Sequence, residues 1–354
     1  MNPKVISVVG ARPQFVKLAP VAEAMAHSGV RHLIVHSGQH YDHTMSESFF
    51  DDLAIPAPNI NLGIGSGSHG SQTGAMLPAL EDVFQAERPD WVLVYGDTNT
   101  TLAAALAAVK IHLPVAHLEA GLRSFNRRMP EEHNRVLTDH AADLLLAPTE
   151  VAMDHLAHEG LAPISRLVGD VMTDVCYRVA NSVRPGWRDS GLPDPGPDSY
   201  LLATIHRPDN TDFPERLEAI LAALAGLPLP VRLAAHPRLR EWAERFGIEL
   251  TRPGIELIQP LAYPAMVAAV IDSAGVVTDS GGLQKEAYLL GRPCTTVRPE
   301  TEWVETLQDG WNVLANEPEG IGLAATRAVP TTPPGQPYGD GHAAAKVVQA
   351  LLTA

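Results

Sequence analysis

The sequence predicts an α/β protein made of two doubly wound parallel sheets, each in its own domain, with a cleft between the domains. Three observations predict this fold. Short apolar runs recur along the chain, each followed by a Gly, Asp, Ser or His turn and then by a helical pattern, which is typical of βαβ units. The runs form two series, separated by a segment rich in Pro and Gly. The length of 354 residues is about that of two domains.

The apolar runs indicate the strands in chain order. The first series gives Val5–Val9, His32–His36, Trp91–Tyr95, Pro114–Leu118 and Leu144–Ala147. The second series gives Tyr200–Ile205, Val231–Ala235, Gly275–Thr278 and Cys294–Val297. We therefore expect Rossmann-like domains at residues 1–183 and 200–340, a linker at residues 184–199, and a C-terminal helix at residues 341–354 that packs back.

Composition narrows the class of function. Lys and Arg total 26 against 41 Asp and Glu, and the net charge of −15 argues against general affinity for nucleic acid or anionic membranes. A bound phosphate must then be held by a few local cations. The cysteines Cys176 and Cys294 lie far apart, which suits a reducing compartment such as the cytoplasm. The first residues indicate a strand instead of a signal peptide, and no apolar run approaches the roughly 18 residues that span a bilayer.

Two patterns that resemble cofactor sites have simpler explanations. Residues 65–70 match GxGxxG, but they follow a polar loop instead of a buried strand, and no ribose-binding acid follows about twenty residues later. We expect a flexible loop there and no NAD. The histidines form no HExxH arrangement, so we expect solvated or capping roles for His40, His43, His155 and His158. We therefore expect the protein to work without a metal ion and without a cofactor.

Candidate catalytic acids lie beyond the carboxyl ends of the strands, where ligands bind in such sheets. Asp97 follows the third run, Glu119 follows the fourth, and Glu131 falls in the first turn of the next helix. Converging carboxylates push one another's pKa values apart, which suits acid and base roles. The alternatives are that Asp97 is a helix N-terminal acid and that Glu131 pairs with Arg135 on a solvated face. An unpaired Glu119 at the end of a buried strand would be costly.

The second series of strands carries a candidate nucleotide site. Ser280–Gly282 ends a strand and opens a helix, so free N–H groups, a hydroxyl and the positive helix end together cradle a phosphate. A capped helix start is the alternative. Glu286, further along the same helix, suits a ribose diol; the alternative is a solvated pair with Lys285 or Arg292.

Two further residues suit contacts with phosphate. Arg12 stands between the first strand and its helix, and its planar fork matches phosphate oxygens. His206 ends the first strand of the second series, where it suits donation to a departing pyrophosphate. A surface arginine and a structural histidine are the alternatives.

Long ordered strings cover nearly the whole chain. They are GARPQFVKLAP (10–20), SGQHYDHTMSESFF (37–50), YGDTNTTLAAALAA (95–108), HLEAGLRSFNRRMPEEHNR (117–135), VGDVMTDV (168–175), ATIHRPDN (203–210), TDSGGLQKEA (278–287) and RPETEWVE (298–305). Together these strings resemble the non-hydrolysing UDP-N-acetylglucosamine 2-epimerases. The resemblance implies a GT-B-like fold, UDP held mainly by the second domain, and a homodimer.

The resemblance also implies an activity and a site. The activity is reversible 2-epimerisation of UDP-GlcNAc to UDP-ManNAc, by elimination of UDP to a glycal and re-addition, without nicotinamide. Asp97, Glu119 and Glu131 would be the catalytic acids and bases, and His206 would assist the leaving UDP. The matching substrate-binding positions are Arg12, Lys17, Gln39, Arg123, Arg135, His236, Leu261, Tyr263, Ser280, Gly281, Gly282 and Glu286.

The chain departs from the family pattern at several positions. Trp303 stands where many bacterial members have the arginine of TERPE, and HRREN appears as His206–Asn210. We therefore expect weak or absent activation by a second UDP-GlcNAc. The strings GARPQF, RSFNRRMPEE and TEWVE are similar to the branch that acts on UDP-2,3-diacetamido-2,3-dideoxyglucuronate. That epimerase, a hydrolysing epimerase releasing ManNAc and UDP, a GT-B glycosyltransferase with an acceptor, and a non-catalytic UDP-sugar sensor stay open as alternatives.

Overall fold

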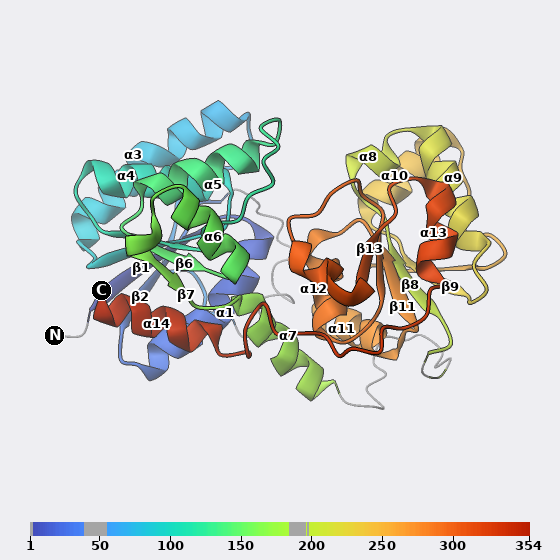
Figure 1. The fold of residues 1–354 in the computed structure, drawn as a ribbon. Helices are drawn as coiled ribbons and strands as arrows, with labels where there is room; N and C mark the ends of the chain where they lie inside the picture. Colours follow the sequence, from blue (N-terminus) through green and yellow to red (C-terminus); the bar gives the residue numbers. More distant parts are fainter. Residues whose placement is uncertain (1–2, 39–54, 184–195, 197) are drawn as a thin grey trace. The chain divides into compact units, whose positions relative to one another are not determined.

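The chain divides into two compact units, each with its own parallel sheet (Figure 1). The computed structural model describes residues 3–38, 55–183, 196 and 198–354. Unit 1 comprises Met1–Tyr177 and Pro337–Ala354, and unit 2 comprises Arg178–Gln336. The division falls inside helix α7 (Val171–Ser182), earlier than the predicted boundary after residue 183. The predicted linker, residues 184–199, lies mostly outside the described residues.

The C-terminal segment returns to unit 1 at Pro337, ahead of the predicted helix 341–354. Its backbone is already held there, because the N–H of Asp170 donates to the carbonyl of Tyr338 at 2.9 Å. Asp174 then accepts from the first N–H groups of helix α14 (Ala343–Thr353), at 2.9 and 2.8 Å. Helix α14 packs against helix α1, so the end of the chain completes one face of unit 1.

The described residues of unit 1 form a parallel sheet of seven strands in the order β3-β2-β1-β4-β5-β6-β7. Its strands are β1 (Lys4–Val9), β2 (Arg31–His36), β3 (Ile60–Asn61), β4 (Trp91–Tyr95), β5 (Val115–Leu118), β6 (Leu144–Ala147) and β7 (Ser165–Leu167). The five predicted strands of the first series are present. The chain winds outward in both directions from the β1–β4 pair, which is the switch point where such sheets bind ligands.

Helices cover both faces of this sheet. They are α1 (Arg12–His27), α3 (His69–Glu87), α4 (Asn99–Lys110), α5 (Pro130–Ala141), α6 (Glu150–His158), α7 and α14. Figure 1 shows α3, α4 and α5 on one side and α1 and α14 on the other. The central strands are therefore buried on both faces, which explains their predominantly apolar sequence.

The GxGxxG match lies where β3 runs into α3. Residues 65–70, predicted as a loop, include the start of α3 at His69, because the hydroxyl of Ser68 accepts from the N–H of Ser71 and caps the helix. The residues before them, predicted as a polar loop, form β3 at the sheet edge. Among the described residues, no group of three or more His, Cys, Asp and Glu side chains could hold a metal ion. No helix in the described ranges is long and apolar enough to cross a membrane.

The described residues of unit 2 form a parallel sheet of six strands in the order β10-β9-β8-β11-β12-β13. Its strands are β8 (Leu201–Thr204), β9 (Val231–Ala234), β10 (Ile255–Ile258), β11 (Gly275–Thr278), β12 (Cys294–Thr296) and β13 (Asn312–Leu314). Its helices are α8 (Pro208–Thr211), α9 (Pro214–Ala225), α10 (Pro237–Phe246), α11 (Tyr263–Asp272), α12 (Gly281–Leu289) and α13 (Pro318–Ala325). The switch point of this sheet is the β8–β11 pair.

Alternate residues of the β8–β11 pair face opposite layers. Leu201, Ala203 and Val277 pack with α9, α10 and α13, whereas Leu202 and Val276 pack with α11 and α12. This double-sided burial fixes the register of the two strands. The carboxyl ends of β8 and β11 therefore bring the segments that begin at His206 and Ser280 to the same edge of the sheet.

Candidate functional site

The edge of unit 1 beyond β4 and β5 gathers charged side chains. Tyr95 and Leu118 are paired at the ends of these strands, so Asp97 and Glu119 follow at adjacent positions. Glu119 has a φ of 75°, a conformation that a residue with a side chain rarely adopts. A Cβ on Gly96 would lie 3.1 Å from Oε2 of Glu119, so the glycine leaves room for that carboxylate.

Lys17 is the cation at the centre of this edge. Its Nζ forms an ion pair with Oε2 of Glu119, and both groups are largely buried. Burial alone would lower the pKa of Lys17, but the charges of Glu119, Asp97 and Asp170 outweigh it and raise the pKa above its ordinary value. Lys17 therefore stays a cation that is paired with Glu119 and feels the negative charge of Asp97.

Asp97 is held from helix α5. Arg135 donates to its Oδ2 from Nε (3.0 Å) and Nη2 (2.7 Å), and Asn134 donates to its carbonyl (2.8 Å). Arg135 also donates from Nη1 to Glu132 at 2.8 Å. Burial would lower the pKa of Arg135, but Asp97 and Glu132 raise it above its usual range. The arginine is therefore an anchor between Asp97 and its own helix.

Glu131 and Glu132 have different environments although they are neighbours. Glu132 is buried and accepts from the N–H groups of Ser124 and Phe125, each at 2.9 Å. Burial would raise its pKa, but these hydrogen bonds and Arg135 hold it below its usual range. Glu131 makes no hydrogen bond or ion pair within the described ranges, so the alternative of a pair between Glu131 and Arg135 is wrong.

A buried ion network lies beneath the turn that carries Glu119. The carboxylate of Asp139 contacts Nδ1 of His117 at 2.6 Å and Nη1 of Arg123 at 2.7 Å, and Nε2 of His117 donates to the carbonyl of Gly96 at 2.8 Å. Burial would raise the pKa of Asp139, but the contacts with His117 and Arg123 outweigh burial and hold the pKa below its usual range. The network thus joins the turns after β4 and β5.

Arg123 belongs to this network and not to a ligand-binding surface. Its side chain is only 1% exposed, and beyond Asp139 it donates from Nε and Nη2 to Glu159, both at 2.8 Å. Burial would lower its pKa, but these two carboxylates raise it. The prediction that Arg123 binds substrate is therefore wrong, since its hydrogen-bonding groups are committed inside unit 1.

In unit 2, Asp279 organises the turn after β8. It accepts from the backbone N–H of His206 (3.0 Å), the backbone N–H of Arg207 (2.8 Å) and Nδ2 of Asn210 (3.0 Å). Nδ1 of His206 lies 3.1 Å from its Oδ1. Burial would raise the pKa of Asp279, but these contacts lower it. The imidazole of His206 is thus oriented by a carboxylate, with its side chain 33% exposed.

The other predicted residues of unit 2 lie on neighbouring elements. The ring of His236, which caps α10 by accepting from the N–H of Arg238 (3.2 Å), lies 5.1 Å from the ring of His206. Leu261 packs at the rim of an apolar cluster, and Tyr263 is the first residue of α11. Glu286 is buried on α12, so its alternative as a solvated carboxylate is wrong.

The start of α12 is capped and crowded. The hydroxyl of Ser280 accepts from the N–H of Leu283 at 3.4 Å. A Cβ on Gly281 would lie 2.6 Å from Oε1 of Glu302 and would displace that carboxylate, whereas Gly282 meets nothing closer than 4.0 Å. Nη2 of Arg298 pairs with Oε2 of Glu302 at 2.9 Å. The predicted phosphate cradle therefore has a charged pair beside it.

Known proteins share this architecture and sequence. A family model described as UDP-N-acetylglucosamine 2-epimerase matches residues 22–352. The chain belongs to the UDP-N-acetylglucosamine 2-epimerase family. A UDP-N-acetylglucosamine 2-epimerase homolog from Methanococcus maripaludis is 44% identical, covering 98% of this chain and 99% of the relative. The UDP-2,3-diacetamido-2,3-dideoxy-D-glucuronate 2-epimerase of Pseudomonas aeruginosa is 45% identical over the same shares.

A solved structure extends the likeness of this UDP-GlcNAc 2-epimerase family member to three dimensions. The crystal structure of Methanocaldococcus jannaschii UDP-GlcNAc 2-epimerase in complex with UDP-GlcNAc and UDP matches with a TM-score of 0.88 and 36% identity. The match covers 99% of this chain and 100% of that one. The two-domain, GT-B-like fold predicted from the sequence is therefore confirmed.

Within this epimerase-family fold, the predicted residues form two groups. In unit 1, Asp97 and Glu119 lie around Lys17, while Glu131 stands on the helix that anchors Asp97 without a bond to either acid. In unit 2, His206 and Ser280 follow the paired strands β8 and β11. The side chain of Arg12 and the whole of Gln39 lie outside the described residues.

Several residues that hold the candidate site together were missed by sequence reasoning. Gln14 accepts from the N–H of Gly10 (2.8 Å) and donates to the carbonyl of Tyr95 (2.8 Å), which joins the turn after β1 to the end of β4. Asp279 and Arg298 were also missed. Gln14 and Asp279 each stand in a strand-end string that the sequence had marked, which was the available signal for them.

Proposed function

We propose that the chain catalyses the reversible 2-epimerisation of UDP-GlcNAc to UDP-ManNAc, by elimination of UDP to a glycal and re-addition of UDP. The observation that carries the proposal is the group in unit 1, where Glu119 pairs with Lys17 and the charge of Asp97 also acts on Lys17. Acids fixed around a cation suit proton transfer at a carbon whose acidity must be raised. The crystallised M. jannaschii relative with UDP-GlcNAc and UDP supports the choice of ligand.

The proposed chemistry assigns a role to each group. The C1–O bond breaks and its electron pair leaves with UDP, which makes C1 electron-poor and C2–H acidic. A carboxylate takes the C2 proton, and the C–H electrons form the C1–C2 double bond of the glycal. In the return, a proton is delivered to the opposite face of C2 as UDP re-adds to C1. We assign these transfers to Asp97, Glu119 and Glu131.

Unit 2 supplies the proposed nucleotide grip. Ser280, Gly281 and Gly282 offer a hydroxyl and N–H groups at the positive end of α12, and His206, oriented by Asp279, donates to the departing diphosphate. Glu286 lies on the same helix for the ribose. Arg12, Lys17, Gln39, His236, Leu261 and Tyr263 stay proposed substrate contacts, and Arg135 is proposed to act through Asp97. We further propose a cytoplasmic homodimer that supplies sugars for cell-surface polysaccharide.

Proton NMR of the purified protein with UDP-GlcNAc in D₂O tests the proposal. We expect UDP-ManNAc to appear and solvent deuterium to enter C2 of both sugars without any acceptor. A glycosyltransferase would need an acceptor and leave C2 protonated. Stoichiometric release of UDP with free ManNAc would indicate a hydrolysing epimerase, and binding without turnover or exchange would indicate a sensor.

The second candidate substrate is UDP-2,3-diacetamido-2,3-dideoxyglucuronate. The P. aeruginosa enzyme named for this substrate is 45% identical to the chain, which favours it. Each UDP sugar is to be assayed separately at equal concentration for deuterium incorporation at C2. If only the diacetamido-uronate is turned over, it is the substrate in place of UDP-GlcNAc, and the proposed mechanism still holds.

A further inference from the structure

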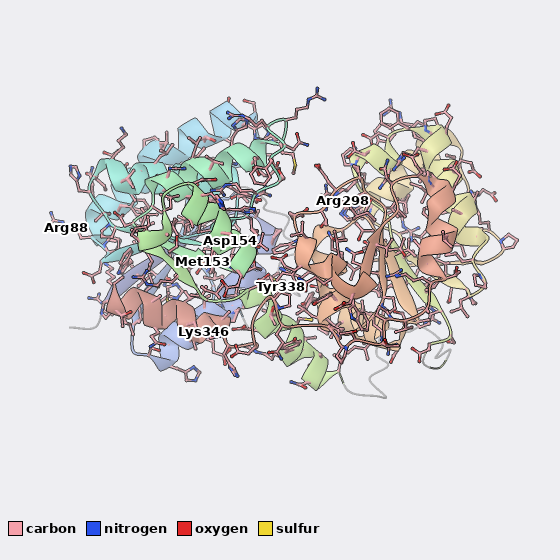
Figure 2. All side chains as sticks on the ribbon, viewed as in Figure 1. Arg88, Met153, Asp154, Arg298, Tyr338 and Lys346 are labelled. Atoms are coloured by element: carbon pink, nitrogen blue, oxygen red, sulfur yellow. The ribbon has the colours of Figure 1, made fainter. Side chains whose placement is uncertain are left out.

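Arg298 is a buried cation with one end unused. Arg298, labelled in Figure 2, comes two residues after the end of β12, and it is 5% exposed. Nη2 pairs with Glu302, but Nη1 is buried and has no hydrogen-bond partner among the described residues. A buried donor without a partner destabilises the fold, so native proteins keep such groups mainly where a ligand or water completes them.

The unused nitrogen faces the first turn of α12. A Cβ placed on Gly281 would lie 3.8 Å from Nη1 of Arg298 and 2.6 Å from Oε1 of Glu302. The first N–H groups of a helix have no acceptor within it, and Ser280 caps only that of Leu283. The N–H groups of Gly281 and Gly282 therefore have no acceptor within the helix, and Nη1 of Arg298 lies beside Gly281. Arg298 and the helix end converge on one volume.

The segment that carries Arg298 and Glu302 is fixed to α12 by its neighbours. The Nζ of Lys285 lies 3.8 Å from the centre of the Trp303 ring, a cation–π contact. The hydroxyl of Thr301 donates to Oε1 of Gln284 at 2.8 Å and accepts from the N–H of Trp303 at 3.1 Å. Arg298 is therefore pre-organised at the helix end and needs little reordering to bind.

A second arginine lies within electrostatic reach of Arg298. Burial and then the positive charge of Arg298 lower the pKa of Arg207, while Glu302, Asp279 and Asp209 oppose this effect. Like charges brought together in a partly buried place favour a bound anion between them. Because Asp279 is already saturated by His206, Arg207 and Asn210, Glu302 is the nearby carboxylate that pairs with Arg298.

We propose that Arg298 is a phosphate ligand, donating from Nη1 to the diphosphate of a nucleotide seated at the N-terminus of α12, with Glu302 clamping the guanidinium through Nη2. This inference rests on the proposed function for the identity of the nucleotide as UDP. It adds a binding residue that the phosphate cradle alone does not include. Arginine suits the role because its fork holds a carboxylate and a phosphate at once.

Calorimetric titration with UDP and with uridine tests the inference. We expect Arg298→Met to weaken UDP binding by about 10- to 100-fold, the effect of losing a charge-assisted hydrogen bond, while uridine binding is kept. Glu302→Gln removes a negative charge beside the phosphate, so it should keep or strengthen UDP binding. Arg292→Met is the matched control, because Arg292 pairs with the exposed Asp198 of the same unit. We expect this variant to bind UDP as the wild type does.

The opposite effects of the two variants separate ligand binding from structure. If Arg298 only stabilises the fold through Glu302, both variants lower the melting temperature and weaken UDP and uridine alike, which overturns the inference. Unchanged UDP affinity in Arg298→Met also overturns it. If Arg298→Met fails to fold, Arg298→Lys takes its place. A loss of UDP affinity in Arg298→Lys that does not occur in Glu302→Gln then supports the inference.

Inorganic pyrophosphate separates this inference from the proposed function. If the wild-type protein binds pyrophosphate through Arg298 but does not prefer UDP, UDP is rejected as the nucleotide and Arg298 is kept as an anion ligand. If the protein is an active epimerase but its UDP affinity does not depend on Arg298, the proposed function is kept and the role of Arg298 is rejected.

Discussion

Arg135 donates two hydrogen bonds to one carboxylate oxygen of Asp97, from Nε at 3.0 Å and from Nη2 at 2.7 Å. Asn134, the preceding residue of α5, holds the backbone carbonyl of Asp97 at 2.8 Å. The third arm of Arg135 reaches Glu132 at 2.8 Å, so the arginine is itself tied to its helix. Helix α5 thus orients Asp97, and Arg135 acts on the proposed chemistry through that acid.

Replacing Arg135 by lysine tests this positioning role. A lysine cannot form the forked contact with Asp97 and also reach Glu132, so Asp97 loses its fixed orientation. We expect kcat for C2 exchange to fall by about 10- to 100-fold, as misplaced catalytic groups typically cause, with little change in the Kd of UDP. Arg166→Lys is the control, since Arg166 donates only to the backbone carbonyls of Pro163 and Ser165 in the described structure. A wild-type kcat in Arg135→Lys would reject the role.

Neutral isosteres of the three candidate acids test the mechanism itself. We expect Asp97→Asn, Glu119→Gln and Glu131→Gln each to lower kcat by at least ~100-fold, on general acid–base magnitudes, while UDP binding largely survives. Glu132→Gln is the informative neighbour, because Glu132 anchors the backbone of Ser124 and Phe125. We expect Glu132→Gln to lower the free energy of unfolding more than the three acid variants do. Near-normal turnover in all three acid variants would remove the mechanism.

The fold could be predicted from the sequence wherever a strand is buried on both faces. Trp91–Tyr95 is a continuous apolar run for that reason, and Val5–Val9 is apolar except for Ser7. Strand β3, with the two residues Ile60 and Asn61, and strand β7 (Ser165–Leu167) carry too little apolar sequence to be recognised. Both lie at or near the sheet edges, where hydrogen bonds to a neighbouring strand, and not burial, define them.

The site could be predicted only in part, because neighbours in sequence differ in environment. Asp97 and Glu119 were recognisable because Glu119 directly follows a predicted strand and Asp97 comes two residues after another. Sequence alone does not tell which of Glu131 and Glu132 faces the core, since this depends on where the loop before α5 passes. The role of Arg123 was mistaken because its partner Glu159 lies beyond α5, β6 and α6 in the chain.

Removing Arg123 tests its reassignment to a structural network. Arg123→Met would leave Asp139 buried with one cation fewer, and breaking a buried pair in this way costs about 3–5 kcal/mol. We expect urea unfolding to show that loss. Arg252→Met is the control, because its pair with the half-exposed Glu218 should contribute at most about 1 kcal/mol. A stable Arg123→Met protein with weakened UDP binding would restore the substrate-binding role.

The stability of unit 1 should fall in mild acid because of His32. The Tyr95 hydroxyl contacts the Ser7 hydroxyl at 2.8 Å, and Ser7 contacts Nε2 of His32 at 2.8 Å. Burial raises the pKa of Tyr95, so its phenol stays protonated and can donate, which leaves Ser7 to donate to a neutral His32. Burial also lowers the pKa of His32 from 6.5 to about 4. The folded protein therefore binds fewer protons than the unfolded chain between these pH values.

This difference sets the direction and the window of the pH dependence. The contribution of neutral His32 is complete above pH 6.5 and is lost progressively as the pH falls towards about 4, below which both states are protonated. We expect urea unfolding at about pH 7.5 and about pH 4.5 to show that the wild type loses on the order of 3 kcal/mol more than His32→Gln does. The exposed His158, changed to Gln, should leave the wild-type dependence in place. If His32→Gln and the wild type lose stability in parallel, His32 titrates normally in the folded protein and its chain to Ser7 and Tyr95 does not hold it neutral.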